Sequence, residues 1–62
     1  MCEANAYILN DKGEEVLFLE RVDKIVPQEE GLYLENIFGQ RKVVKARIKE
    51  MALVEHKIIL EK

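Results

Sequence analysis

Short runs of apolar residues alternate with polar turn residues along most of the chain. Residues 4–9 form the first run, and residues 16–19 form a second run of strand length. Between them, residues 10–13 read Asn-Asp-Lys-Gly, a turn sequence in which Gly13 can adopt positive φ. The pattern therefore predicts a β-hairpin in the first third of the chain.

The middle of the chain carries two further strand patterns. Residues 22–26 predict a weaker strand, and Pro27 marks its edge or its end because proline donates no hydrogen bond to a neighbouring strand. A turn is expected at residues 29–31. Apolar and polar positions then alternate over residues 32–35, which is typical of a half-buried strand, and Gly39 lies in the next predicted turn.

The segment 42–48 supports two interpretations. Apolar and basic residues alternate along it, which favours a strand, but residues 43–52 are also rich in helix formers and place apolar residues at helical spacing. We favour the strand and expect it to end in a turn at residues 50–52.

The last predicted strand covers residues 53–60. Its alternation places Val54, His56, Ile58 and Leu60 on one face.

Six short strands with closely spaced turns predict an all-β fold, a small barrel or sandwich that forms one domain over residues 1–62. Because the connections are short, we expect an antiparallel sheet. Apolar side chains occupy consecutive positions at 16–19 and 58–60, so both faces of these strands are apolar. A small barrel has one interior, and we therefore expect a homodimer to cover the second apolar face.

Charge and composition argue against several classes of protein. The formal net charge is −2, which is not the basic balance of a protein that binds nucleic acid through phosphates. A single cysteine excludes a disulfide within the chain, and no signal peptide or membrane-spanning apolar stretch is visible. We expect a cytoplasmic protein. One basic run could still contact RNA phosphates, although it also fits the polar face of a strand: Arg41, Lys42, Lys45, Arg47 and Lys49.

Little in the sequence supports catalysis. The chain has no Ser, Thr or Trp, no glycine-rich phosphate loop and no zinc or calcium motif. Cys2 and His56 could form a nucleophile–base pair, but no third residue is evident to orient it. We expect His56 to be a hydrogen-bonded histidine in the core or in an interface, and the protein not to be an enzyme.

Cys2 has the most specific chemistry in the chain. Methionine is usually removed before a residue as small as cysteine, and Cys2 would then carry both an α-amine and a thiol that close a five-membered chelate ring on a metal. If Met1 stays, the backbone amide nitrogen of Cys2 could replace the amine. Two chains would supply two nitrogens and two sulfurs, and a planar set of this kind suits Ni(II) or Cu(II), whereas Zn(II) prefers a tetrahedron.

The sequence resembles the CooT family of small nickel-binding proteins. The resemblance lies in residues 1–5 (Met-Cys-Glu-Ala-Asn), 34–39 (Leu-Glu-Asn-Ile-Phe-Gly) and 44–50 (Val-Lys-Ala-Arg-Ile-Lys-Glu). It implies a small SH3-like antiparallel β-barrel that forms a homodimer and binds one Ni(II) per dimer at Cys2. It also implies an accessory role in delivering nickel to carbon monoxide dehydrogenase, with that enzyme or other nickel-maturation proteins as partners. No role is carried over for His56.

We therefore expect a Ni(II)-binding metallochaperone or nickel-storage protein. The alternatives are an RNA-binding module that uses the basic run, and a structural subunit that docks its second apolar face on another protein.

Overall fold

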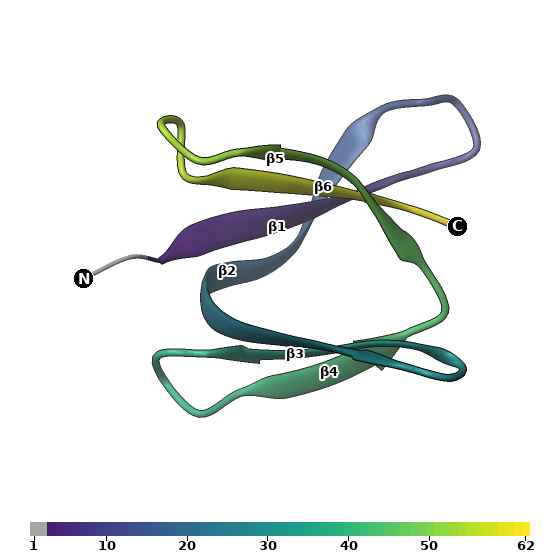
Figure 1. The fold of residues 1–62 in the computed structure, drawn as a ribbon. Helices are drawn as coiled ribbons and strands as arrows, with labels where there is room; N and C mark the ends of the chain where they lie inside the picture. The colour runs from purple at the N-terminus through teal and green to yellow at the C-terminus, as the bar shows by residue number, and fades with distance from the viewer. Residues whose placement is uncertain (1–2) are drawn as a thin grey trace.

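The computed structural model describes residues 3–62, and Met1 and Cys2 lie outside the described residues. The described chain folds into six β-strands (Figure 1). Their bounds are β1 Ala4–Leu9, β2 Glu15–Gln28, β3 Gly31–Asn36, β4 Arg41–Val44, β5 Arg47–Ala52 and β6 Lys57–Glu61. The all-β prediction is therefore confirmed.

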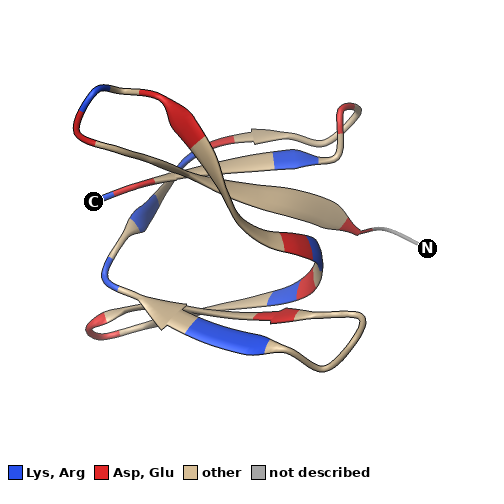
Figure 2. Ribbon diagram, turned by 180° about the vertical axis from the view of Figure 1, so that it is seen from behind, with Lys and Arg blue, Asp and Glu red and all other residues tan. Residues whose placement is uncertain are grey.

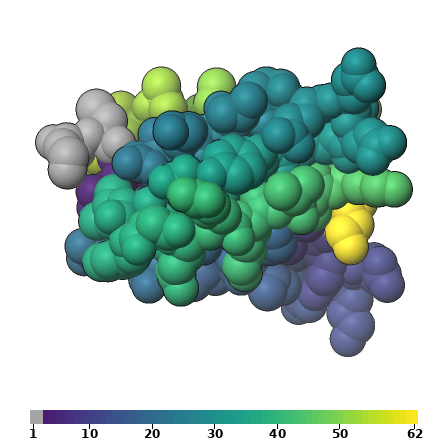
Figure 3. Space-filling view, turned by 90° about the horizontal axis from the view of Figure 1, so that it is seen from below, coloured from purple at the N-terminus to yellow at the C-terminus, as the bar shows by residue number. Residues whose placement is uncertain are grey.

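The six strands form one sheet in the order β4-β3-β2-β1-β6-β5. The long strand β2 joins its two halves, because its first part pairs with β1 and its second part pairs with β3. Figure 1 shows β1, β5 and β6 together on one side, β3 and β4 on the other, and β2 curving between them. From below, β3 and β4 cover much of the visible surface (Figure 3).

The prediction of a small SH3-like barrel is wrong in one respect, because the sheet does not close into a barrel. The edge strands β4 and β5 follow one another closely in the chain, yet no ladder pairs them within residues 3–62, so the sheet stays open there. The reason is the break at residues 45–46, where the chain leaves one half of the sheet and enters the other.

The expectation of a purely antiparallel sheet is also wrong at one pair. β1 and β6 run parallel, with Ala6 opposite Ile58 and Ile8 opposite Leu60. Short loops force antiparallel pairing only between consecutive strands. β1 and β6 are far apart in sequence, and the four intervening strands supply the long connection that a parallel pair needs.

The preference for extended chain over a helix at residues 43–52 is confirmed, but the single strand predicted at residues 42–48 is wrong, because residues 45–46 separate two strands, β4 and β5. The two strands predicted at residues 16–19 and 22–26 are instead one strand, β2, which continues past Pro27. The predicted turn at residues 50–52 lies later, at residues 53–56, so the last strand begins at Lys57.

The core lies between the two halves of the sheet. Its buried residues come from β1, β2, β3 and β6: Ala6, Leu19, Val22, Leu32, Leu34, Ile58 and Leu60. Asn36 is buried among them, with only 2% of its surface exposed. Its Oδ1 accepts from the amides of Phe38 and Gln40, and its Nδ2 donates to Gln40 Oε1, so the turn between β3 and β4 is built around a satisfied polar side chain.

Candidate functional site

Cys2, the expected metal ligand, lies outside the described residues, so the structure defines its surroundings only from Glu3 onwards. Glu3 immediately precedes β1. The residues that contact Glu3 and the first residues of β1 therefore form the described part of the candidate site.

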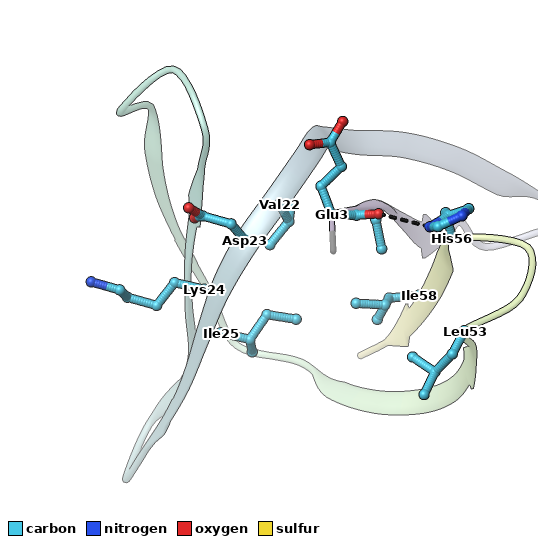
Figure 4. A pocket seen from close by; sticks show the side chains of 9 residues that line it. Glu3, Val22, Asp23, Lys24, Ile25, Leu53, His56 and Ile58 are labelled. Carbon is cyan, nitrogen blue, oxygen red and sulfur yellow. Dashed lines mark hydrogen bonds between the residues drawn. The ribbon is translucent and has the colours of Figure 1, made fainter. Parts of the chain in front are cut away.

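His56 is the residue that contacts this segment most directly. Its Nδ1 lies 3.1 Å from the Glu3 carbonyl oxygen, as the dashed line in Figure 4 shows, and its own carbonyl accepts from the Asn5 amide at 2.8 Å. A carbonyl oxygen can only accept, so Nδ1 must donate and the proton of a neutral His56 ring lies on Nδ1. The other nitrogen, Nε2, then carries a free lone pair.

The prediction that His56 lies on a strand is wrong, and so is its placement in the core, whereas its placement in an interface stays a prediction. The residue is exposed and belongs to the turn before β6, with φ of 54°. Val54, predicted on the same face, is 94% exposed in the same turn. The misplacement arises because the apolar alternation continues from β6 into the turn, and alternation alone does not show where a strand begins. The hydrogen bond that we expected for His56 is present.

Arg21 holds the other side of the same segment. Its backbone amide donates to Asn5 Oδ1 at 3.0 Å, and its Nε lies 3.9 Å from Glu3 Oε1. Like His56, it has a left-handed backbone, with φ of 52°. Non-glycine residues in this conformation are uncommon and often mark functional sites. No sequence signal indicated Arg21, because arginine is not a residue that favours this conformation.

Two hollows adjoin this segment. One is apolar, about 290 Å³ in volume, and Ile25 and Ile58 point into it from β2 and β6 while Lys24 points away (Figure 4). The other, about 410 Å³ in volume, is lined by four residues with polar side chains: Glu3, Asn5, Arg21 and His56. Within residues 3–62, no three His, Cys, Asp or Glu residues are grouped as a metal site would need.

The basic run does not form one strand face. Arg41 and Lys42 lie on β4 and Arg47 lies on β5, at opposite edges of the sheet. Lys42 Nζ donates to the Phe18 carbonyl at 2.8 Å, and Arg47 Nε lies 3.2 Å from Glu61 Oε2. Figure 2 shows basic and acidic residues interspersed around the sheet. This arrangement offers no continuous basic surface along the described chain.

Comparisons with known proteins agree with the resemblance in the sequence. A family model described as CO dehydrogenase accessory protein CooT matches residues 1–61. The chain belongs to the CooT family. The chain is similar to a protein assigned to CooT from Carboxydothermus hydrogenoformans, whose crystal structure is known. The two sequences are 66% identical, and the structures superpose with a TM-score of 0.90 over 98% of this chain and 97% of that one. Among curated proteins, no sequence matches this chain.

The CooT family is one of accessory proteins of CO dehydrogenase rather than of enzymes. The family match includes Cys2. In residues 3–62, no helix is long and apolar enough to cross a membrane.

Proposed function

We propose that this CooT protein binds Ni(II) through Cys2, one ion per homodimer, and serves the maturation of CO dehydrogenase in the cytoplasm as a metallochaperone or nickel store. The family match over residues 1–61 carries the proposal, since it joins an accessory role for CO dehydrogenase to a chain that has one cysteine, at position 2. Nickel is the cargo here, and the protein catalyses no reaction.

The chemistry of the N-terminal cysteine supports nickel as that cargo. Each chain supplies one thiolate and one adjacent nitrogen, so two chains supply a four-donor set of nitrogen and sulfur. Metal binding displaces the thiol proton, which lets the thiolate ligate near neutral pH. The contacts of His56 and Arg21 around Glu3 and Asn5 add support, because they attach the chain next to Cys2 to the folded sheet.

Exposed apolar side chains support the homodimer. Three of them gather at the end of the β5–β6 hairpin, where Met51, Leu53 and Val54 are 55%, 68% and 94% exposed. This hairpin includes the turn that contains His56, which contacts Glu3. A dimer formed through this end of the molecule would bring the two N-terminal segments together, as a shared metal site requires.

The RNA alternative has no comparable support, because the basic run is divided between two separate edge strands and the break that joins them, and several of its residues pair with groups of the same chain.

Titration of the reduced protein with Ni(II), followed by absorbance, tests the proposal. Thiolate-to-nickel charge-transfer bands should saturate at half an ion per chain, and Cys2→Ser should lose them. Circular dichroism of the variant is the control that it stays folded. Identical titrations of the native chain and Cys2→Ser would exclude the cysteine site.

A further inference from the structure

We propose that the edge strand β4 binds an extended, acidic segment of a partner protein, which joins the sheet as a further strand. The inference goes beyond the proposed nickel function and does not depend on it. Three features of β4 carry it: a backbone edge that faces away from β3, a regular ladder to β3, and basic side chains with no acidic residue among them.

The backbone of β4 has one side available for pairing. β4 ends the strand order, so within residues 3–62 it pairs with β3 alone, and it lies along the lower side of the molecule in Figure 1. The Asn36 amide donates to the Gln40 carbonyl at 3.0 Å, and bonded and non-bonded residue pairs alternate along an antiparallel ladder. Arg41 and Val43 are therefore the residues of β4 whose backbone N–H and C=O groups point away from β3.

The two edges of the sheet differ in how well they resist a further strand. β5 pairs with β6 through a register shift between Ile48 and Glu50, and irregularities of this kind discourage further pairing. β4 pairs with β3 without a shift. Lysine often protects an edge, but the Lys42 side chain turns back onto its own chain, where Nζ donates to the Phe18 carbonyl at 2.8 Å and lies 4.7 Å from the centre of that ring. β4 is therefore the edge that is open to addition.

The side chains of β4 indicate which kind of strand fits. Val43 is 65% exposed and lies opposite Tyr33 of β3. The Arg41 side chain is 70% exposed; its Nε faces Glu35 Oε1 at 3.9 Å, which leaves other guanidinium donors for a carboxylate on the free side. Residues 41–46 contain three basic residues and no acidic one, and Figure 2 shows a blue stretch at the start of β4.

This charge selects an acidic partner over a second copy of the chain. Opposite charges on neighbouring strands stabilise a sheet, and like charges directly opposite destabilise it. Pairing β4 with β4 across a two-fold axis would set two basic segments against each other. An added strand should instead place carboxylates beside the basic positions and an apolar residue beside Val43.

A short peptide with capped ends and the sequence Glu-Val-Val-Glu-Glu is the probe. Laid antiparallel to β4, it puts glutamates beside the three basic residues of segment 41–46 and valines beside Val43 and Val44. In NMR spectra of nitrogen-labelled protein, we expect the peptide to shift the amide signals of Arg41 and Val43 most, with a dissociation constant of roughly 1 mM or below. Lys-Val-Val-Lys-Lys is the charge control and should leave these signals unchanged.

A second peptide separates strand pairing from charge attraction. Methylation of the peptide nitrogens that would face β4 removes the backbone donors and keeps every carboxylate. This peptide should bind the native chain at least about tenfold more weakly.

A variant of the protein tests the same contact from the other side. Val43→Pro removes the outward amide and spares the bonds to β3, because an edge strand tolerates proline where its nitrogen faces solvent. We expect it to weaken peptide binding by at least about tenfold. Val43→Ala keeps the amide, so it is the matched control and should stay within about threefold of the native chain. Circular dichroism checks that both variants fold.

Three results would overturn the inference. Unchanged β4 amide signals at about 5 mM peptide would show that the edge binds no acidic strand. Equal binding of the methylated and unmethylated peptides would show attraction by charge without strand addition. Shifts of the β4 signals with protein concentration alone, or tighter binding of single-stranded RNA to β4, would assign the edge to a second copy or to RNA.

The test is independent of the proposed nickel function. Cys2→Ser should bind the peptide as the native chain does, whereas the nickel titration should lose its thiolate bands in that variant. Failure of either proposal therefore leaves the other in place.

Discussion

At the residue scale, Asn5 connects Arg21 and His56, the two residues within 3–62 that have a left-handed backbone and are not glycine. Its amide donates to the His56 carbonyl, and its Oδ1 accepts from the Arg21 amide. A left-handed conformation costs a non-glycine residue roughly 1–2 kcal/mol. The fold retains this cost twice around one short segment, which suggests that the placement of the N-terminal segment matters to function.

Gly31 gives a prediction about folding stability. It has φ of 149°, and a Cβ atom built on it would collide with the Val44 carbonyl oxygen. Gly31→Ala should therefore lower the free energy of unfolding by about 2 kcal/mol or more, measured by urea denaturation. Gly13→Ala is the matched control: Gly13 also has positive φ, at 77°, but its Cβ would meet no atom within 4 Å. Equal losses in the two variants would show that the contact with Val44 is unimportant.

Glu35 gives a prediction about pH. The Tyr33 hydroxyl donates to its carboxylate at 2.7 Å, and this bond lowers the pKa of Glu35 from its usual value. A lowered carboxyl pKa adds stability at pH values above the unfolded pKa of about 4.3, and that stability disappears as the pH falls through the folded pKa. When the pH falls from about 6 to about 3, the free energy of unfolding of Tyr33→Phe should therefore decrease less than that of the native protein.

Urea midpoints across that range measure the effect. A native protein and a Tyr33→Phe variant with parallel pH profiles would contradict the assignment.

At the element scale, β2 decides the architecture. Val22 pairs with Ala4 of β1 and with Asn36 of β3, so it is the point at which the two halves of the sheet meet. Arg21 is left-handed directly before it, and a register shift follows it. Bulges of this kind bend a strand sharply, which lets one strand serve both halves.

Local patterns predicted the elements better than their boundaries. β1 matches its predicted range, and the buried alternation of β3 was evident at Leu32 and Leu34. The bend of β2, the parallel pairing of β1 with β6 and the late start of β6 depend on contacts between distant segments, which local alternation does not encode. For the same reason the sequence indicated Cys2 as a ligand but gave no sign that His56 contacts the neighbouring residue.

The β5–β6 hairpin gives a prediction about association. Val54→Glu places a charge on the exposed apolar end of this hairpin and should raise the dimer dissociation constant by about tenfold or more, without unfolding the chain. Val43→Glu on β4, where Val43 is 65% exposed, is the matched control and should leave association unchanged. Sedimentation equilibrium distinguishes them. A monomeric native chain, or a loss of the dimer only in Val43→Glu, would contradict this interface.

At the scale of the whole molecule, the small size of the chain means that a partner chain or a bound metal would contribute to folding stability as well as to function. A domain of about 60 residues buries only about 60% of the surface that its unfolded chain exposes. Any ligand or second chain that binds only the folded state stabilises it. A dimer bridged by one nickel ion would supply both, which links the small size of the chain to its proposed role.

Native mass spectrometry of the nickel-loaded protein tests this central claim most directly. We predict a species of two chains and one nickel ion, lighter than the sum of its parts by at least two protons, one for each cysteine thiolate. Cys2→Ser should give no such species. One nickel per single chain, or a two-chain nickel complex that survives Cys2→Ser, would contradict the account.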